Sequence, residues 1–200
     1  MYNERYGLEQ AVIDGIKITT RRTAYNGEIS KPNWGICIEG KDKGKAYLCD
    51  GECVMAKSKY AIGEVVSVAQ SYKIIEDKLP VPLADNEFEQ KQSYHIYGDL
   101  PGWHNKMFVK AELMPRRIKI TDIRLERMQD ISDKDCIKEG IIKNERGFPD
   151  VYYFFDNKTS LWNGFPSARE AFSILIDKVS GKGTWGNNPW VFVYDFELVK

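Results

Sequence analysis

The chain has 200 residues, of which 42% are hydrophobic and 29% are charged, a balance typical of a globular domain with a sizeable core. Its 29 basic and 29 acidic residues cancel, which excludes a broad electrostatic coating of duplex nucleic acid but not a local basic site. No apolar run approaches the roughly 20 residues that span a bilayer, and the first residues lack the apolar core of a signal peptide. We therefore expect a cytoplasmic protein that does not enter membranes.

Metal-binding chemistry is not indicated by the cysteines and histidines. Cys49 and Cys53 flank a short turn, but no second closely spaced pair follows to complete a zinc site. Without a secretory segment, the cysteines are expected to be reduced thiols. We expect no bound metal and no cofactor at these side chains: Cys37, Cys49, Cys53, Cys136, His95 and His104.

The first candidate site is the segment Gly15–Arg22, which reads GIKITTRR. Apolar residues at helical spacing predict an amphipathic helix over Arg5–Asp14, and Gly15 stands where a left-handed residue ends a helix. A short β-prone run, Ile16–Thr23, follows. Its lysine, threonines and arginines suit a cleft edge that holds an anion or a polarised carbonyl. They also suit an ordinary solvated strand whose arginines pair with acids.

Three further strands are predicted, beyond a loop-rich surface excursion over Thr23–Lys45. Ala46–Cys49 is expected to be a short strand that a turn ending at Cys53 closes into a hairpin. Val65–Tyr72 is expected to be a buried strand, near whose end Gln70 either satisfies backbone groups or points its amide at a ligand. Ile118–Leu125 alternates as a half-buried strand with a phase slip at its centre, within the most cationic part of the chain.

The C-terminal half contains the clearest local patterns. Asp130–Gly140 has a capping-box-like start and a glycine stop, which predict a short helix. Ser167-x-x-Glu170 is a capping box that begins a longer amphipathic helix. Ile141–Gly164 is rich in aromatic residues and is interpreted as an irregular insertion packed on the body. Trp190–Leu198 alternates aromatic residues with others and is the strongest predicted strand, with its aromatic face in the core.

Four segments, taken together and in order, resemble the bacterial and phage branch of the ASCH-domain family. They are GIKITTRR, IGEVVSVAQSY, RIKITDIRLERMQDISDKDCIKEGI and GTWGNNPWVFVYDFEL. The resemblance implies one domain over residues 1–200 with insertions near residues 23–60, 73–105 and 141–164. It implies an α+β, PUA-like fold, in which helices surround a mixed, mostly antiparallel β-barrel.

The resemblance also implies a site associated with RNA or a modified nucleoside. Some family members resemble an amidohydrolase that deacetylates acetylcytidine with a lysine, a threonine three residues later, and a glutamate from a V-x-E strand. Lys17 and Thr20 fit that spacing, whereas Gln70 takes the place of the glutamate, and Ile18 stands where a threonine is usual. An amide cannot accept and return a proton in acyl transfer near neutral pH, so this change preserves binding better than catalysis.

Three hypotheses follow, in order of preference. The first is a protein that binds RNA, a nucleotide or a nucleoside in a basic, polar cleft. The second is an enzyme, either an amidohydrolase acting on acylated nucleosides or a ribonuclease, with Lys17 and Thr20 catalytic. The third is a structural or partner-binding protein without a ligand. The candidate ligand-binding residues are Lys17, Thr20, Arg21, Arg22, Gln70, Ser71 and Arg117.

Overall fold

The structure is a computed structural model that describes residues 6–75, 100–144, 151–156 and 161–199. The chain divides into two compact units. Of the described residues, the larger unit contains 6–65, 119–144, 151–156 and 161–198, and the smaller contains 66–75, 100–118 and 199. Helices and mostly antiparallel strands are mixed along the chain, which confirms the α+β class.

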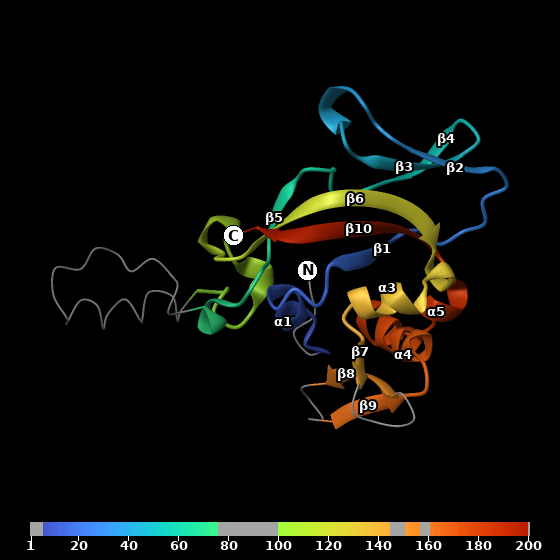
Figure 1. Cartoon of the computed structure of the whole chain (residues 1–200). Coiled ribbons are helices and arrows are strands. Elements are labelled where there is room, and N and C mark those ends of the chain that lie inside the picture. Colours follow the sequence, from blue (N-terminus) through green and yellow to red (C-terminus); the bar gives the residue numbers. More distant parts are fainter. Residues whose placement is uncertain (1–5, 76–99, 145–150, 157–160, 200) are drawn as a thin grey trace, which may run out of the picture. The chain divides into compact units, whose positions relative to one another are not determined.

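The main sheet has the strand order β1-β10-β6-β5, and the boundary between the units cuts β5, β6 and the last residue of β10. Strands β1 and β10 are antiparallel, with Thr19 opposite Asp195. In the larger unit β10 lies between β1 and β6, so it has a strand on each side (Figure 1). The four strands are β1 (Thr19–Tyr25), β5 (Val65–Ser67), β6 (Arg117–Arg127) and β10 (Trp190–Val199).

Strand β10 is buried on both faces along its first half. Phe192 and Tyr194 on one face are buried, which confirms the predicted aromatic core face. Val191 and Val193 on the other face are equally buried, a result that the aromatic alternation did not indicate. A central strand covered on both faces needs apolar residues in succession rather than in alternation.

Helix α1 (Leu8–Ile13) ends as the sequence predicted. Gly15 has φ +72°, its N–H donates to the Val12 carbonyl at 3.1 Å, and the N–H of Ile16 donates to the Ala11 carbonyl at 2.9 Å. These two bonds form a Schellman motif, which satisfies carbonyls at the helix end. The strand that follows begins at Thr19 rather than Ile16, because the N–H of Ile18 donates to the Lys138 carbonyl instead.

A second sheet, with the order β2-β3-β4, occupies the region predicted as a loop and a hairpin. Its strands are β2 (Pro32–Ile36), β3 (Ala46–Asp50) and β4 (Cys53–Lys57). The hairpin of β3 and β4 is confirmed, with Gly51 at φ +60° in its turn. The loop interpretation of Thr23–Lys45 was wrong at its centre, because β2 pairs with β3 over its whole length.

Helices α3 (Asp133–Lys138), α4 (Ala168–Ser180) and α5 (Thr184–Asn187) belong to the larger unit, where α4 packs against both other helices. Both predicted caps are confirmed: Ser132 accepts from the N–H of Asp135, and Ser167 accepts from the N–H of Glu170, each at 3.1 Å. None of the described helices has both the length and the apolar character needed to cross a bilayer.

The third sheet corrects the interpretation of Ile141–Gly164 as irregular. Strands β7 (Ile142–Asn144), β8 (Val151–Asp156) and β9 (Leu161–Phe165) form an antiparallel sheet. Phe154 is buried and stacks on Phe165 with ring centroids 5.7 Å apart. Phe154 therefore packs on the core side of a small sheet, and strand propensity outweighed the absence of a clean alternation.

The smaller unit has its own apolar cluster, in which Tyr72, Ile75 and Met114 are buried. The predicted strand Val65–Tyr72 stops at Ser67, and Tyr72–Ile74 is a 3₁₀ helix. Past Val68 the backbone leaves the ladder, because the N–H of Gln70 donates to the Met114 sulfur at 3.3 Å. Packing of Tyr72 into this cluster therefore ended the strand early.

Candidate functional site

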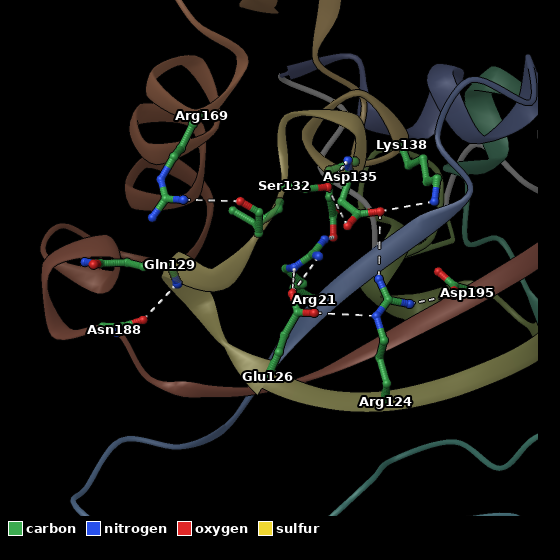
Figure 2. Close-up of polar contacts among 12 residues, drawn as sticks. Arg21, Arg124, Glu126, Gln129, Ser132, Asp135, Lys138, Arg169, Asn188 and Asp195 are labelled. Carbon is green, nitrogen blue, oxygen red and sulfur yellow. Dashed lines mark hydrogen bonds and ion pairs between the residues drawn. The ribbon is translucent and has the colours of Figure 1, made fainter.

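A network of ion pairs in the larger unit, buried at Lys17, Arg21 and Glu139 and more exposed elsewhere, forms the candidate site. It connects β1, β6 and β10 with the helix α3, and Figure 2 shows much of it. Four cations and four carboxylates take part, so their formal charges cancel. The members are Lys17, Arg21, Arg124, Lys138, Glu126, Asp135, Glu139 and Asp195.

Lys17 lies at the inner end of the network. It follows the Schellman turn of α1 and precedes β1, with only 3% of its side chain exposed. Its Nζ forms an ion pair with the Glu139 carboxylate and donates to the Glu139 carbonyl at 2.9 Å. Burial lowers the pKa of Lys17 below its ordinary value, although the Glu139 carboxylate opposes this shift.

Glu139 is the residue that sequence reasoning missed. It follows the last residue of α3 and precedes Gly140, which has φ +103°. A Cβ at Gly140 would lie 3.1 Å from the Leu8 side chain and 3.8 Å from the Cβ of Lys17. The glycine therefore allows the end of α3 to approach the segment between α1 and β1, and this approach brings Glu139 to Lys17.

Arg21 connects Glu139 to a second carboxylate. Its Nη1 donates to Glu139 Oε1 at 3.0 Å, and its Nε donates to Glu126 Oε1 at 2.8 Å. The side chain is fully buried, and burial alone would lower its pKa. The carboxylates of Glu139 and Glu126 outweigh that effect and raise the pKa of Arg21, so the guanidinium stays charged.

Arg124 connects the buried part of the network to more exposed side chains. Its Nη1 donates to Asp195 Oδ2 at 2.6 Å, and its Nε lies 3.5 Å from Glu126 Oε2. Asp135 is 4.0 Å from Arg124 Nη2 and also accepts from Lys138 at 3.1 Å. Figure 2 shows Arg21 and Arg124 directed at Glu126, which they share.

The predicted residues of the GIKITTRR segment divide between the two faces of β1. Side chains alternate along a strand, so Thr19 and Arg21 point to one face, and Thr20 and Arg22 to the other. The network therefore brings Lys17 and Arg21 together through Glu139. Thr20 is buried opposite Tyr194 on the other face, and the hydroxyl that shares the face of Arg21 is that of Thr19.

The remaining predicted residues belong to the smaller unit. Gln70 and Ser71 are buried there, in the segment between β5 and the 3₁₀ helix that begins at Tyr72. Arg117 is exposed at the first position of β6. Among the residues that the structure describes, no group of three His, Cys, Asp or Glu side chains is arranged to hold a metal ion.

Cys136 lies in α3, close to the network, and is completely buried. Burial raises the pKa of its thiol to about 12. At pH 8 we expect Cys136 to react with a thiol reagent about a thousandfold more slowly than an unperturbed cysteine, because little thiolate is present. The exposed Cys53 is the internal control, and mass spectrometry of the native protein measures both rates. Equal labelling of the two cysteines would contradict the prediction.

Comparisons with models of known protein families, with curated proteins and with solved structures found no match for this chain. The resemblance to ASCH-domain proteins therefore depends on the four sequence segments.

Proposed function

We propose that this chain is an ASCH-like protein with a PUA-like β-barrel, and that it hydrolyses an amide bond in acylated nucleosides. Lys17 and Glu139 would be its proton-transferring pair. The observation that carries this proposal is the contact between a buried lysine of lowered pKa and a buried carboxylate. A lysine whose pKa burial lowers is a characteristic general base, and strongly perturbed ionisable groups cluster at functional sites.

The chemistry needs one proton acceptor that later becomes a donor. Neutral Lys17 takes a proton from an attacking hydroxyl, which adds to the acyl carbonyl. The resulting ammonium returns the proton to the leaving amine, so that one water and one amide yield a carboxylic acid and a free amino group. Glu139 holds Nζ in place and stabilises the ammonium. The attacking hydroxyl is that of water, because Thr20 lies on the face of β1 opposite Arg21.

The carboxylate that the resemblance requires does not have to come from the position of Gln70. Glu139 supplies a carboxylate to Lys17 from a different part of the sequence. The missing glutamate at position 70 disfavours catalysis only if no other carboxylate reaches Lys17, and Glu139 reaches it. The second hypothesis from the sequence is therefore preferred over the first.

Binding of RNA or a nucleotide without turnover is the second candidate. Lys17 and Arg21 are poorly placed to bind a phosphate, because the phosphate would have to displace Glu139 and Glu126 from them. Exposed cations at alternate positions of β6, Arg117 and Lys119, are the observation in its favour. Such binding would weaken steeply with added salt.

The test is turnover of N4-acetylcytidine by the full chain. We expect the wild type to release acetate, and Lys17→Met to reduce kcat by about 10²–10⁴-fold, the usual contribution of a general base. Lys134→Met, which removes an exposed lysine of α3, is the matched control and should retain full activity. Thr20→Val should retain activity, because Thr20 lies on the face of β1 opposite Arg21, and loss of activity would instead indicate a threonine nucleophile.

Two results would contradict the proposal. One is wild-type protein without turnover between pH 6 and pH 10, and the other is full activity in Lys17→Met. Absence of turnover together with salt-sensitive RNA binding would favour the second candidate. Gln70→Glu, assayed alongside, tests whether a carboxylate at that position adds to the rate.

A further inference from the structure

The Glu139 carboxylate is divided between two cations. Its Oε1 accepts a hydrogen bond from Nη1 of Arg21 at 3.0 Å, and its Oε2 forms the ion pair with Nζ of Lys17. No more than 6% of any of the three side chains is exposed, so bulk water does not screen these contacts. Each oxygen of Glu139 therefore has its own partner, and together the two partners fix the orientation of the carboxylate.

Arg21 is itself held from a second direction. Its Nε donates to Oε1 of Glu126 on β6 at 2.8 Å, while its Nη1 reaches Glu139 at the end of α3. Because the guanidinium is planar, bonds at Nε and Nη1 fix its plane, whereas a lysine ammonium would offer one nitrogen to both carboxylates. Arg21 therefore connects the end of α3 to β6, and this connection sets the place where Glu139 meets Lys17.

Arg21 also limits how strongly Glu139 holds a proton on Lys17. Burial has the largest influence on Lys17 and lowers its pKa. Glu139 raises that pKa, and the positive charges of Arg22 and Arg21 on β1 lower it. Without Arg21, the whole charge of the Glu139 carboxylate would act on Lys17, which would favour the charged lysine.

The other two cations of the network do not replace Arg21. Arg124 pairs with Asp195 and Glu126, and Lys138 pairs with Asp135. Both are therefore engaged with carboxylates other than that of Glu139. The titratable groups that act on Arg21, or on which its charge acts, come from β6 and from α3 with the residue that follows it; they are Glu126, Asp135, Cys136 and Glu139.

We infer that Arg21 is a positioning residue: it holds Oε1 of Glu139 so that Oε2 faces Lys17, and it takes up part of the negative charge that would otherwise keep a proton on Lys17. Arg21 acts through Glu139 and needs no contact with a substrate, in keeping with a side chain that is 0% exposed. Its part in catalysis rests on the proposed function, but its effect on the ionisation of Lys17 does not.

The first measurement is an NMR titration of the full chain carrying isotope-labelled lysine, in which Lys17→Met assigns the signal of Lys17. We expect Arg21→Met to raise the pKa of Lys17, because Glu139 then loses its second cation. The same rise is expected when Arg21→Met is combined with Glu126→Gln. That combination keeps the formal charges of the network balanced, so it decides the question if the single variant does not fold. Arg169→Met, at an exposed arginine of α4, is the matched control and should leave the pKa unchanged.

The second measurement is the pH dependence of N4-acetylcytidine turnover. We expect Arg21→Met to move the rise in rate to higher pH, with kcat at least about 10-fold lower at pH 7 and much of the loss recovered near pH 10. A residue with a merely structural role would lower the rate equally at every pH. Arg21→Lys restores the positive charge but not the hold on both carboxylates, so we expect it to recover the wild-type pH profile without the full kcat.

An unchanged or lowered pKa of Lys17 in Arg21→Met and in its combination with Glu126→Gln would overturn the inference. So would a loss of rate that is the same at every pH. A raised pKa of Lys17 in a protein that does not turn over N4-acetylcytidine would contradict the proposed hydrolysis and support the role of Arg21. Turnover with the same pH profile in the wild type and in Arg21→Met would contradict the role of Arg21 alone.

Discussion

Glu139→Gln is expected to lower the free energy of unfolding by about 3–5 kcal/mol, the usual cost of removing one partner of a buried ion pair. Glu139 is the carboxylate of Lys17 and one of the two carboxylates of Arg21, and all three side chains are buried. The substitution leaves two buried cations with too little negative charge. Urea denaturation at pH 7 measures the change.

Three further variants test whether the loss of stability comes from the buried ion pairs of Glu139. Glu197→Gln changes an exposed glutamate on β10 and should alter stability by less than about 0.5 kcal/mol. Glu126→Gln should have a smaller effect than Glu139→Gln, because Glu126 is more exposed and Arg21 keeps Glu139. Lys17→Met combined with Glu139→Gln should cost less than the sum of the single changes. Wild-type stability of Glu139→Gln would show that the pair is not buried.

Glu139→Gln should also change how the rate of hydrolysis depends on pH. In the proposed hydrolysis Lys17 acts in its neutral form, so we expect the rate to rise with pH through the pKa of Lys17, which lies below its ordinary value of 10.5. Glu139 raises that pKa within the native protein, and its removal should move the rise to lower pH. The folded pKa is depressed, so the contribution of Lys17 to stability is greatest above pH 10.5 and is lost as pH falls through the folded value.

Features encoded by adjacent residues were predictable from the sequence. Gly15 and Gly140 follow the ends of α1 and α3 with positive φ, and Ser132 and Ser167 cap the starts of α3 and α4, because each motif involves only a few neighbouring positions. Strand β2 was missed because its glycine, proline and asparagine resemble a loop. It exists because β3 provides hydrogen-bond partners, which local propensity does not report.

The candidate site was only half predictable for a related reason. Lys17 and Arg21 stand out in one short segment, but Glu139 lies 122 residues from Lys17 and is one acid among 29 acidic residues. Only the close approach at Gly140 brings it to the lysine. The grouping of Lys17 with Thr20 came from the spacing of the family motif. The period of two in a strand places Thr19, not Thr20, on the face of Arg21.

Phe192→Ala is expected to lower the free energy of unfolding by about 3–5 kcal/mol, the range for truncating a buried phenylalanine. Phe192 is 2% exposed and lies on the central strand β10, between β1 and β6, where surrounding backbone limits collapse into the cavity. Phe108→Ala is the matched control, because that phenylalanine is 62% exposed and should change stability by less than about 1 kcal/mol. Thermal and urea denaturation measure both variants. A Phe192→Ala protein as stable as the wild type would mean that this face of β10 is not part of the core.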